Sequence, residues 1–130
     1  MKIHLFIAAL LSFSVLGSIP LSADEASDHF ESRIRPLLKQ ACFECHQAMR
    51  KGGLRLDSRQ DMLSGGKSGP VIVPGDPQKS ILFQAVSRTH PRLKMPPGEP
   101  LEPRQVEDLA RWIKSGAPWP ESRAEFFQKQ

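Results

Sequence analysis

The chain has 130 residues with 18 Lys or Arg and 14 Asp or Glu, giving a formal charge of +4. A single domain is the expectation for this length. The positive charge is mild and no run of basic residues occurs, which argues against nucleic-acid binding and suits docking to an acidic protein partner.

The N-terminal segment predicts a secretory signal peptide. Met1 and Lys2 give a basic start, residues 3–16 are almost wholly apolar, and Ala23 is a small residue placed for cleavage. The apolar run is shorter than the roughly 20 residues of a membrane-spanning helix, so cleavage is favoured over an uncleaved anchor. We therefore expect a signal peptide over 1–23, an extracytoplasmic (periplasmic) location, and no membrane span after cleavage.

The next segment predicts an amphipathic helix over residues 27–40, because apolar residues recur at helical spacing. Pro36 interrupts this pattern and predicts a kink or a restart, since proline lacks a backbone N–H. A short helical turn is expected over 58–63, ended by the pair Gly65 and Gly66.

Two further helices are predicted in the second half of the chain. One covers residues 77–87, with Asp76 as its cap and Pro77 at its first position. The other covers 103–115 and ends at Gly116.

The segments between these helices are rich in glycine and proline, and no alternating pattern predicts a strand. The run 71–73 is too short to found a sheet. We expect an all-α domain over 24–117, with short helices and ordered loops, followed by a polar tail over 118–130. The hydrophobic core of such a chain would be too small to hold its loops in place, unless a large apolar group lies at its centre.

Cys42 and Cys45 are the only cysteines, and His46 follows the second of them. Cys-x-x-Cys-His is the pattern of c-type haem attachment. Two thiols at this spacing reach two vinyl groups on one edge of the porphyrin, and the histidine then lies beneath the iron as a ligand. The sequence therefore predicts one covalently attached haem c.

Other uses of the two cysteines explain less. A zinc site needs about four Cys or His ligands, and only His29 and His90 remain in the mature chain. A thioredoxin-like pair would adjoin a βαβ pattern, which the sequence lacks. A plain disulfide would leave His46 without a role.

The second axial ligand is predicted to be Met95, because Met or His fills this position in electron carriers. Met95 lies in a proline-stiffened loop that can present its thioether at a fixed position. Of the other methionines, Met49 follows His46 too closely to reach the opposite face, and Met62 is expected in the core. His90 is the alternative ligand.

Further contacts to the group are less defined. A carbonyl at Gly69-Pro70 could accept a hydrogen bond from the second ring nitrogen of His46, so Pro70 is a candidate cofactor-binding residue, although a plain turn is an equal interpretation. Trp112 is expected to be core. Four basic residues are candidates for pairing with the haem propionates, with simple solvation the commoner fate: Arg55, Lys67, Arg92 and Lys94.

The sequence as a whole resembles the planctomycete-type cytochrome c domain. The resemblance is carried, in order, by Ile34-Arg35-Pro36-Leu37-Leu38, Cys42-Phe43-Glu44-Cys45-His46, Lys51-Gly52-Gly53-Leu54-Arg55-Leu56-Asp57-Ser58, Gly65-Gly66-Lys67-Ser68-Gly69-Pro70, Pro74-Gly75-Asp76-Pro77, Lys94-Met95-Pro96-Pro97 and Trp112-Ile113 with Gly116-Ala117-Pro118-Trp119-Pro120. It implies the cytochrome c fold, with the N- and C-terminal helices crossing near the haem edge, and His46 and Met95 as iron ligands. In this family the domain commonly heads much larger proteins, whereas this chain stops soon after Trp119, which favours a free-standing carrier or a shortened relative.

The sequence therefore predicts a single-haem cytochrome that transfers one electron at a time between unidentified redox proteins, rather than an enzyme. The alternative is a haem enzyme, or a gas or redox sensor, whose sixth ligand can be displaced. A haem-free interaction module built on the same helices is a third possibility.

Overall fold

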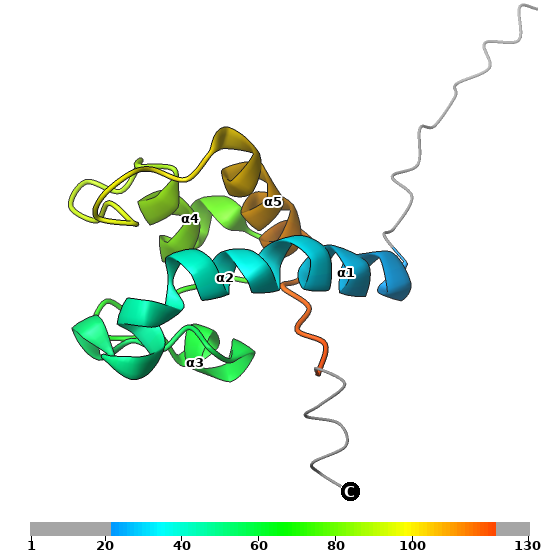
Figure 1. Ribbon diagram of the computed structural model, residues 1–130, viewed down its shortest axis with the longest axis horizontal. Coiled ribbons are helices and arrows are strands. Elements are labelled where there is room, and N and C mark those ends of the chain that lie inside the picture. Colours follow the sequence, from blue (N-terminus) through cyan, green and yellow to red (C-terminus); the bar gives the residue numbers. More distant parts are fainter. Residues whose placement is uncertain (1–21, 122–130) are drawn as a thin grey trace, which may run out of the picture.

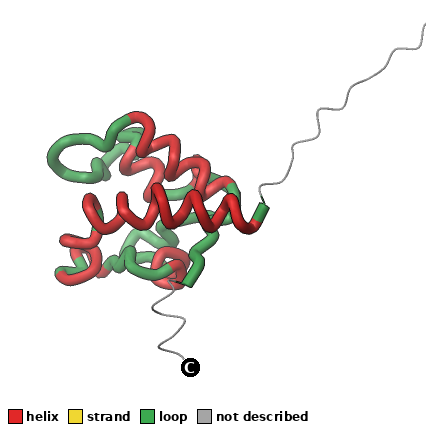
Figure 2. Tube along the Cα trace, turned by 45° about the vertical axis from the view of Figure 1, so that its right-hand side comes forward, coloured by secondary structure: helices red, strands yellow, loops and turns green. Residues whose placement is uncertain are grey.

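The structure is a computed structural model that describes residues 22–121. Nearly all of the predicted signal peptide and residues 122–130 of the predicted tail lie outside the described residues. Between them the chain forms helices joined by loops, with no strand and only an isolated bridge between Gly66 and Gly69 (Figures 1 and 2). The all-α prediction is confirmed, and the arrangement is that of a cytochrome c-like fold.

The N-terminal helical run consists of α1 (Ala23–His29), a π-helical segment η1 (Phe30–Ile34) and α2 (Arg35–Ala41). It begins four residues before the predicted start, because Ser22 and Glu25 form a capping box. In this box the side chain of each residue accepts a hydrogen bond from the backbone N–H of the other. At the predicted interruption the helix changes type instead of stopping: the backbone stays right-handed helical at Ile34 and Arg35, and Pro36, which cannot donate a backbone hydrogen bond, lies where the π-helical η1 gives way to α2.

Three short elements follow: η2 (Glu44–Ala48), η3 (Lys51–Gly53) and α3 (Arg59–Ser64). The predicted helical turn is α3. Its N-terminal cap is Ser58, whose Oγ accepts a hydrogen bond of 3.0 Å from the backbone N–H of Asp61.

The single helix predicted from Pro77 is wrong, because the structure splits it into a 3₁₀ turn η4 (Pro77–Lys79) and α4 (Ile81–Val86). Ser80 separates them in an extended conformation and is fully buried. Its Oγ donates to the carbonyl oxygen of Asp76 at 2.8 Å and accepts from the N–H of Val73 at 2.9 Å. Serine side chains that bond the backbone in this way compete with helix formation.

The last helix, α5 (Pro103–Lys114), lies where it was predicted. It ends in a Schellman motif: the N–H of Gly116 bonds the carbonyl of Ile113, and the N–H of Ala117 bonds that of Trp112, each at 3.0 Å. Gly116 supplies the positive φ that this turn requires.

The main core lies where α5 packs against η1 and α4. Trp112 is fully buried, as expected, and its ring lies 5.9 Å from that of Phe30. The ring of Trp119 lies 4.7 Å from that of Phe30, and the Arg35 guanidinium lies over the rings of Phe30 and Trp119. The start of the predicted tail therefore packs against the domain. No helix within residues 22–121 is long and apolar enough to cross a membrane.

Candidate functional site

A mainly apolar pocket lies between two groups of residues that are far apart in sequence. One wall comes from residues 41–56 and 66–71, and the other from 81–101. The cavity measures about 260 Å³, more than ten times the volume of about 15 Å³ that one water needs. Its size and lining fit a bound organic group. The apolar lining residues are Ala41, Leu54, Leu56, Val71, Ile81, Leu82, Ala85, Val86, Leu93, Pro96, Pro97 and Leu101.

The Cys-x-x-Cys-His segment lies on the first wall. Cys42 ends α2, Cys45 and His46 belong to η2, and the three residues all line the pocket. The N–H of His46 bonds the Cys42 carbonyl at 3.0 Å, while the His46 carbonyl accepts from the N–H of Leu56 at 2.9 Å. These two backbone bonds fix the segment against the loop that follows it.

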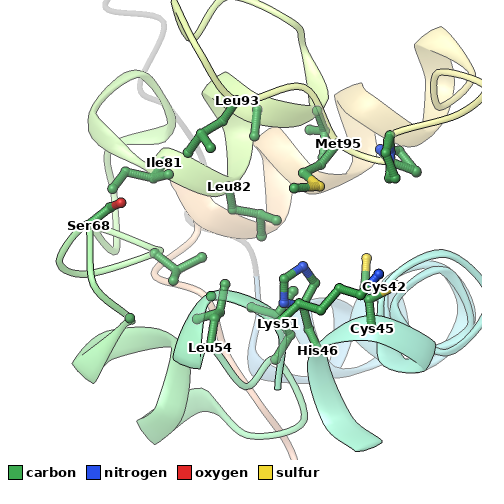
Figure 3. Close-up of a pocket in the computed structure, with 18 of the residues that line it drawn as sticks. Cys42, Cys45, His46, Lys51, Leu54, Ser68, Ile81, Leu82, Leu93 and Met95 are labelled. Carbon is green, nitrogen blue, oxygen red and sulfur yellow. The ribbon is translucent and has the colours of Figure 1, made fainter. Parts of the chain in front are cut away.

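The two thiols lie close together at one side of the pocket and are not joined in a disulfide (Figure 3). Burial, reinforced by the nearby Cys45, raises the pKa of the Cys42 thiol to about 11. This thiol is therefore protonated at neutral pH, which is the form that can add as S–H across a carbon–carbon double bond.

The imidazole of His46 points into the pocket (Figure 3). Its Nδ1 atom is buried and has no hydrogen-bond partner among the described residues. The anticipated bond to the Gly69-Pro70 carbonyls is not formed: Gly69 lines the pocket, but Pro70 is exposed and does not. A buried imidazole nitrogen without a partner is costly in a purely structural role.

Met95 faces His46 from the opposite wall, and its sulfur is directed into the pocket (Figure 3). Its backbone N–H donates to the carbonyl of Ala85 in α4 at 3.1 Å. The loop that carries the thioether is thereby tied to a helix. Together, two thiols at one edge, an imidazole and a thioether on facing walls, and an apolar lining form a donor set that fits haem c.

The alternative ligands lie elsewhere. His90 Nδ1 accepts hydrogen bonds from the N–H groups of Arg92 and Leu93, at 3.2 and 3.0 Å, and does not line the pocket. Met62 is fully buried core, whereas Met49 is 53% exposed. Within residues 22–121, no group of three or more His, Cys, Asp or Glu side chains could hold a metal ion.

Among the basic candidates, only Lys67 lines the pocket, and Lys51 joins it there. Arg55 instead pairs with Asp57, and its guanidinium lowers the pKa of that carboxyl group. Lys94 bonds backbone carbonyls of its own loop. Sequence reasoning missed Lys51. Its position just after the haem motif was the available signal.

An all-α domain that encloses an apolar pocket, with Cys-x-x-Cys-His on one wall and a methionine opposite, defines the cytochrome c class of protein. Residues 42–99 match the family described as Planctomycete cytochrome C, a range that includes both walls of the pocket. This match supports the resemblance to the planctomycete-type cytochrome c domain that the sequence indicated. No curated protein and no solved structure matched the chain. A domain of this kind binds haem c and indicates an electron carrier.

Proposed function

We propose that this protein is an exported single-haem c-type cytochrome that carries one electron at a time between redox proteins. In this proposal Cys42 and Cys45 hold the haem covalently, and His46 and Met95 are its two iron ligands. The observation that carries the proposal is that these four side chains line one apolar pocket, with the imidazole and the thioether on opposite walls (Figure 3).

The residues of the pocket would have three roles toward the haem: covalent attachment, ligation of the iron and exclusion of water. Cys42 and Cys45 would hold the group through two thioether bonds, each formed by adding S–H across one vinyl C=C, with sulfur bonding one carbon and hydrogen the other, so that no oxidant would be needed. The bound group supplies an iron that alternates between the ferric and ferrous states. His46 and Met95 would hold the iron from the two walls of the pocket, which would leave no site for a substrate and would tune the reduction potential. The apolar walls keep water away and limit reorganisation of the surroundings when the charge changes.

The proposal includes export, with residues 1–23 removed as a signal peptide and the domain acting outside the cytoplasm. A c-type cytochrome there would exchange electrons with partner proteins. The mild positive charge of the chain favours partners with an acidic surface.

The direct test is Met95→Ala in the haem-loaded protein. Ferric haem ligated by methionine has a weak red charge-transfer band, and we expect that band in the native protein and not in the variant. Met49→Ala is the matched control, because Met49 is exposed and outside the pocket. A band that survives Met95→Ala would overturn Met95 as the ligand. Haem staining of the exported protein on a denaturing gel tests covalent attachment separately.

The second candidate is a haem enzyme or sensor with a displaceable sixth ligand. It is favoured by one observation only, namely that Met95 lies on a loop rather than within a helix. Rapid binding of carbon monoxide to the reduced native protein at neutral pH would support this candidate, and slow binding supports the electron carrier.

A further inference from the structure

Arg88 follows Ser87, the C-terminal cap of α4, and adopts a left-handed backbone conformation, with φ of 61°. Residues with long side chains rarely adopt this conformation, because Cβ approaches the following carbonyl oxygen. A glycine or asparagine would fit the turn with less strain. The presence of an arginine here calls for an explanation in its side chain.

The side chain of Arg88 reaches across to the loop that contains Met95. Its Nη2 donates hydrogen bonds to the carbonyl oxygens of Pro96 at 3.1 Å and of Gly98 at 3.0 Å. The backbone carbonyl of Arg88 in turn accepts from the Lys94 ammonium, which also donates to the His90 carbonyl at 2.7 Å. One residue is therefore bonded to both sides of Met95.

The loop depends on such outside donors because Pro96 and Pro97 have no backbone N–H. The N–H of Met95 bonds the Ala85 carbonyl, which fixes the loop before the prolines, and Arg88 fixes it at and after them. The Arg88 Nε atom is buried without a hydrogen-bond partner among the described residues. Burying this N–H without a partner costs free energy, which indicates that the position of the guanidinium matters more than its hydration.

We propose that Arg88 is a positioning residue that clamps the Met95 loop over the pocket and thereby keeps the thioether at the iron. The inference rests on the proposed role of Met95 as the axial ligand. Arg88 does not line the pocket, so it acts through the loop and not by contact with the haem.

The test is Arg88→Asn in the haem-loaded protein, with Arg92→Asn as the matched control. Asparagine accepts the left-handed conformation but is too short to reach Pro96 or Gly98. Arg92 lies in the same loop and carries the same charge, and no hydrogen bond or ion pair of its side chain is found within residues 22–121. Three quantities are compared with the native protein: the red charge-transfer band, the rate of carbon monoxide binding to the ferrous form, and hydrogen exchange of the amides over residues 93–98.

We expect Arg88→Asn to weaken the band, to speed carbon monoxide binding about tenfold or more, and to speed exchange at the Met95 amide similarly. This factor corresponds to the loss of hydrogen bonds from a charged donor. Arg92→Asn should match the native protein, and Arg88→Lys, which can still donate to one carbonyl, should lie between them. A general loss of stability would not spare the slow-exchanging core while opening this loop.

The outcomes separate the two proposals. If the native protein shows the band and Arg88→Asn changes none of the three quantities, the clamp is overturned. The clamp is equally overturned if Arg92→Asn has the same effects as Arg88→Asn. If the native protein lacks the band, the proposed function of Met95 fails, while amide exchange in the two variants still decides whether Arg88 holds the loop.

Discussion

The indole Nε1 of Trp112 donates a hydrogen bond of 2.7 Å to the carbonyl oxygen of Pro118. This bond joins the centre of the core to the chain just beyond α5. Arg59 adds two more bonds to the same region, from Nε to the Ala117 carbonyl at 2.8 Å and from Nη2 to the Gly116 carbonyl at 3.2 Å. The segment after the last helix is therefore part of the folded domain.

Trp119→Ala should lower the free energy of unfolding by about 2–4 kcal/mol, since it removes a ring packed against Phe30 and beneath the Arg35 guanidinium. Denaturant unfolding of the haem-loaded protein measures the change. Met49→Ala is the control, because it deletes an exposed apolar side chain and should have an effect below about 0.5 kcal/mol. Equal stabilities of the two variants would show that Trp119 does not belong to the core.

Gly65→Ala should lower the free energy of unfolding by about 3 kcal/mol or more. A Cβ at this position would lie 1.8 Å from the Gly69 carbonyl oxygen, and its φ of +72° is unfavourable for alanine. Gly98→Ala is the matched control, because a Cβ there has no atom within 4 Å and the backbone is not left-handed. Unfolding curves that show the same loss of stability for both variants would contradict the close approach of Gly65 to the Gly69 carbonyl.

The double variant Cys42→Ala with Cys45→Ala should lose covalent haem and most of its stability. Leaving a 260 Å³ cavity empty costs at most about 6 kcal/mol at 24 cal/mol per Å³, which is comparable with the 5–15 kcal/mol of a typical domain. Haem staining and thermal unfolding followed by circular dichroism measure the two effects. A haem-free variant with the native melting temperature would contradict the proposal that the group fills this pocket.

Lys67→Gln should lower the reduction potential, because a positive charge beside the pocket disfavours the ferric state. For a separation of about 10 Å and an effective dielectric constant of about 40, the shift is roughly 35 mV. Redox titration at low ionic strength measures it, and added salt should reduce it. Lys39→Gln, an exposed position outside the pocket, should shift the potential much less. A higher potential for Lys67→Gln would contradict the sign of this argument.

Much of the fold could be predicted because the helix signals are local. Pro103 and Gly116 delimit α5 as their backbone preferences require, and Ser58 caps the start of α3. The split at Ser80 could not be predicted, because it depends on bonds to Asp76 and Val73 that only the folded loop brings within reach. The packing of Trp119 on Phe30 likewise joins residues 89 positions apart.

For the candidate site, Cys42, Cys45 and His46 follow from a contiguous pattern, and Met95 from its proline-rich loop. Their common pocket could not be read from the sequence, since its second wall is made by α4 and the loop after it. Arg88 had no sequence signal at all. Its importance depends on a left-handed backbone and on carbonyls eight and ten residues further along the chain.

One wall of the pocket comes from residues 41–56 and 66–71 and the other from residues 81–101, and this division has a consequence for the order in which the domain assembles. Both cysteines and His46 lie within five consecutive residues, so a porphyrin can be joined to them while the rest of the chain is still extended. The second wall, over residues 81–101, then has a large apolar surface on which to collapse. In this view the haem is a template for the C-terminal half of the domain, and a chain that misses the attachment step has little to fold around.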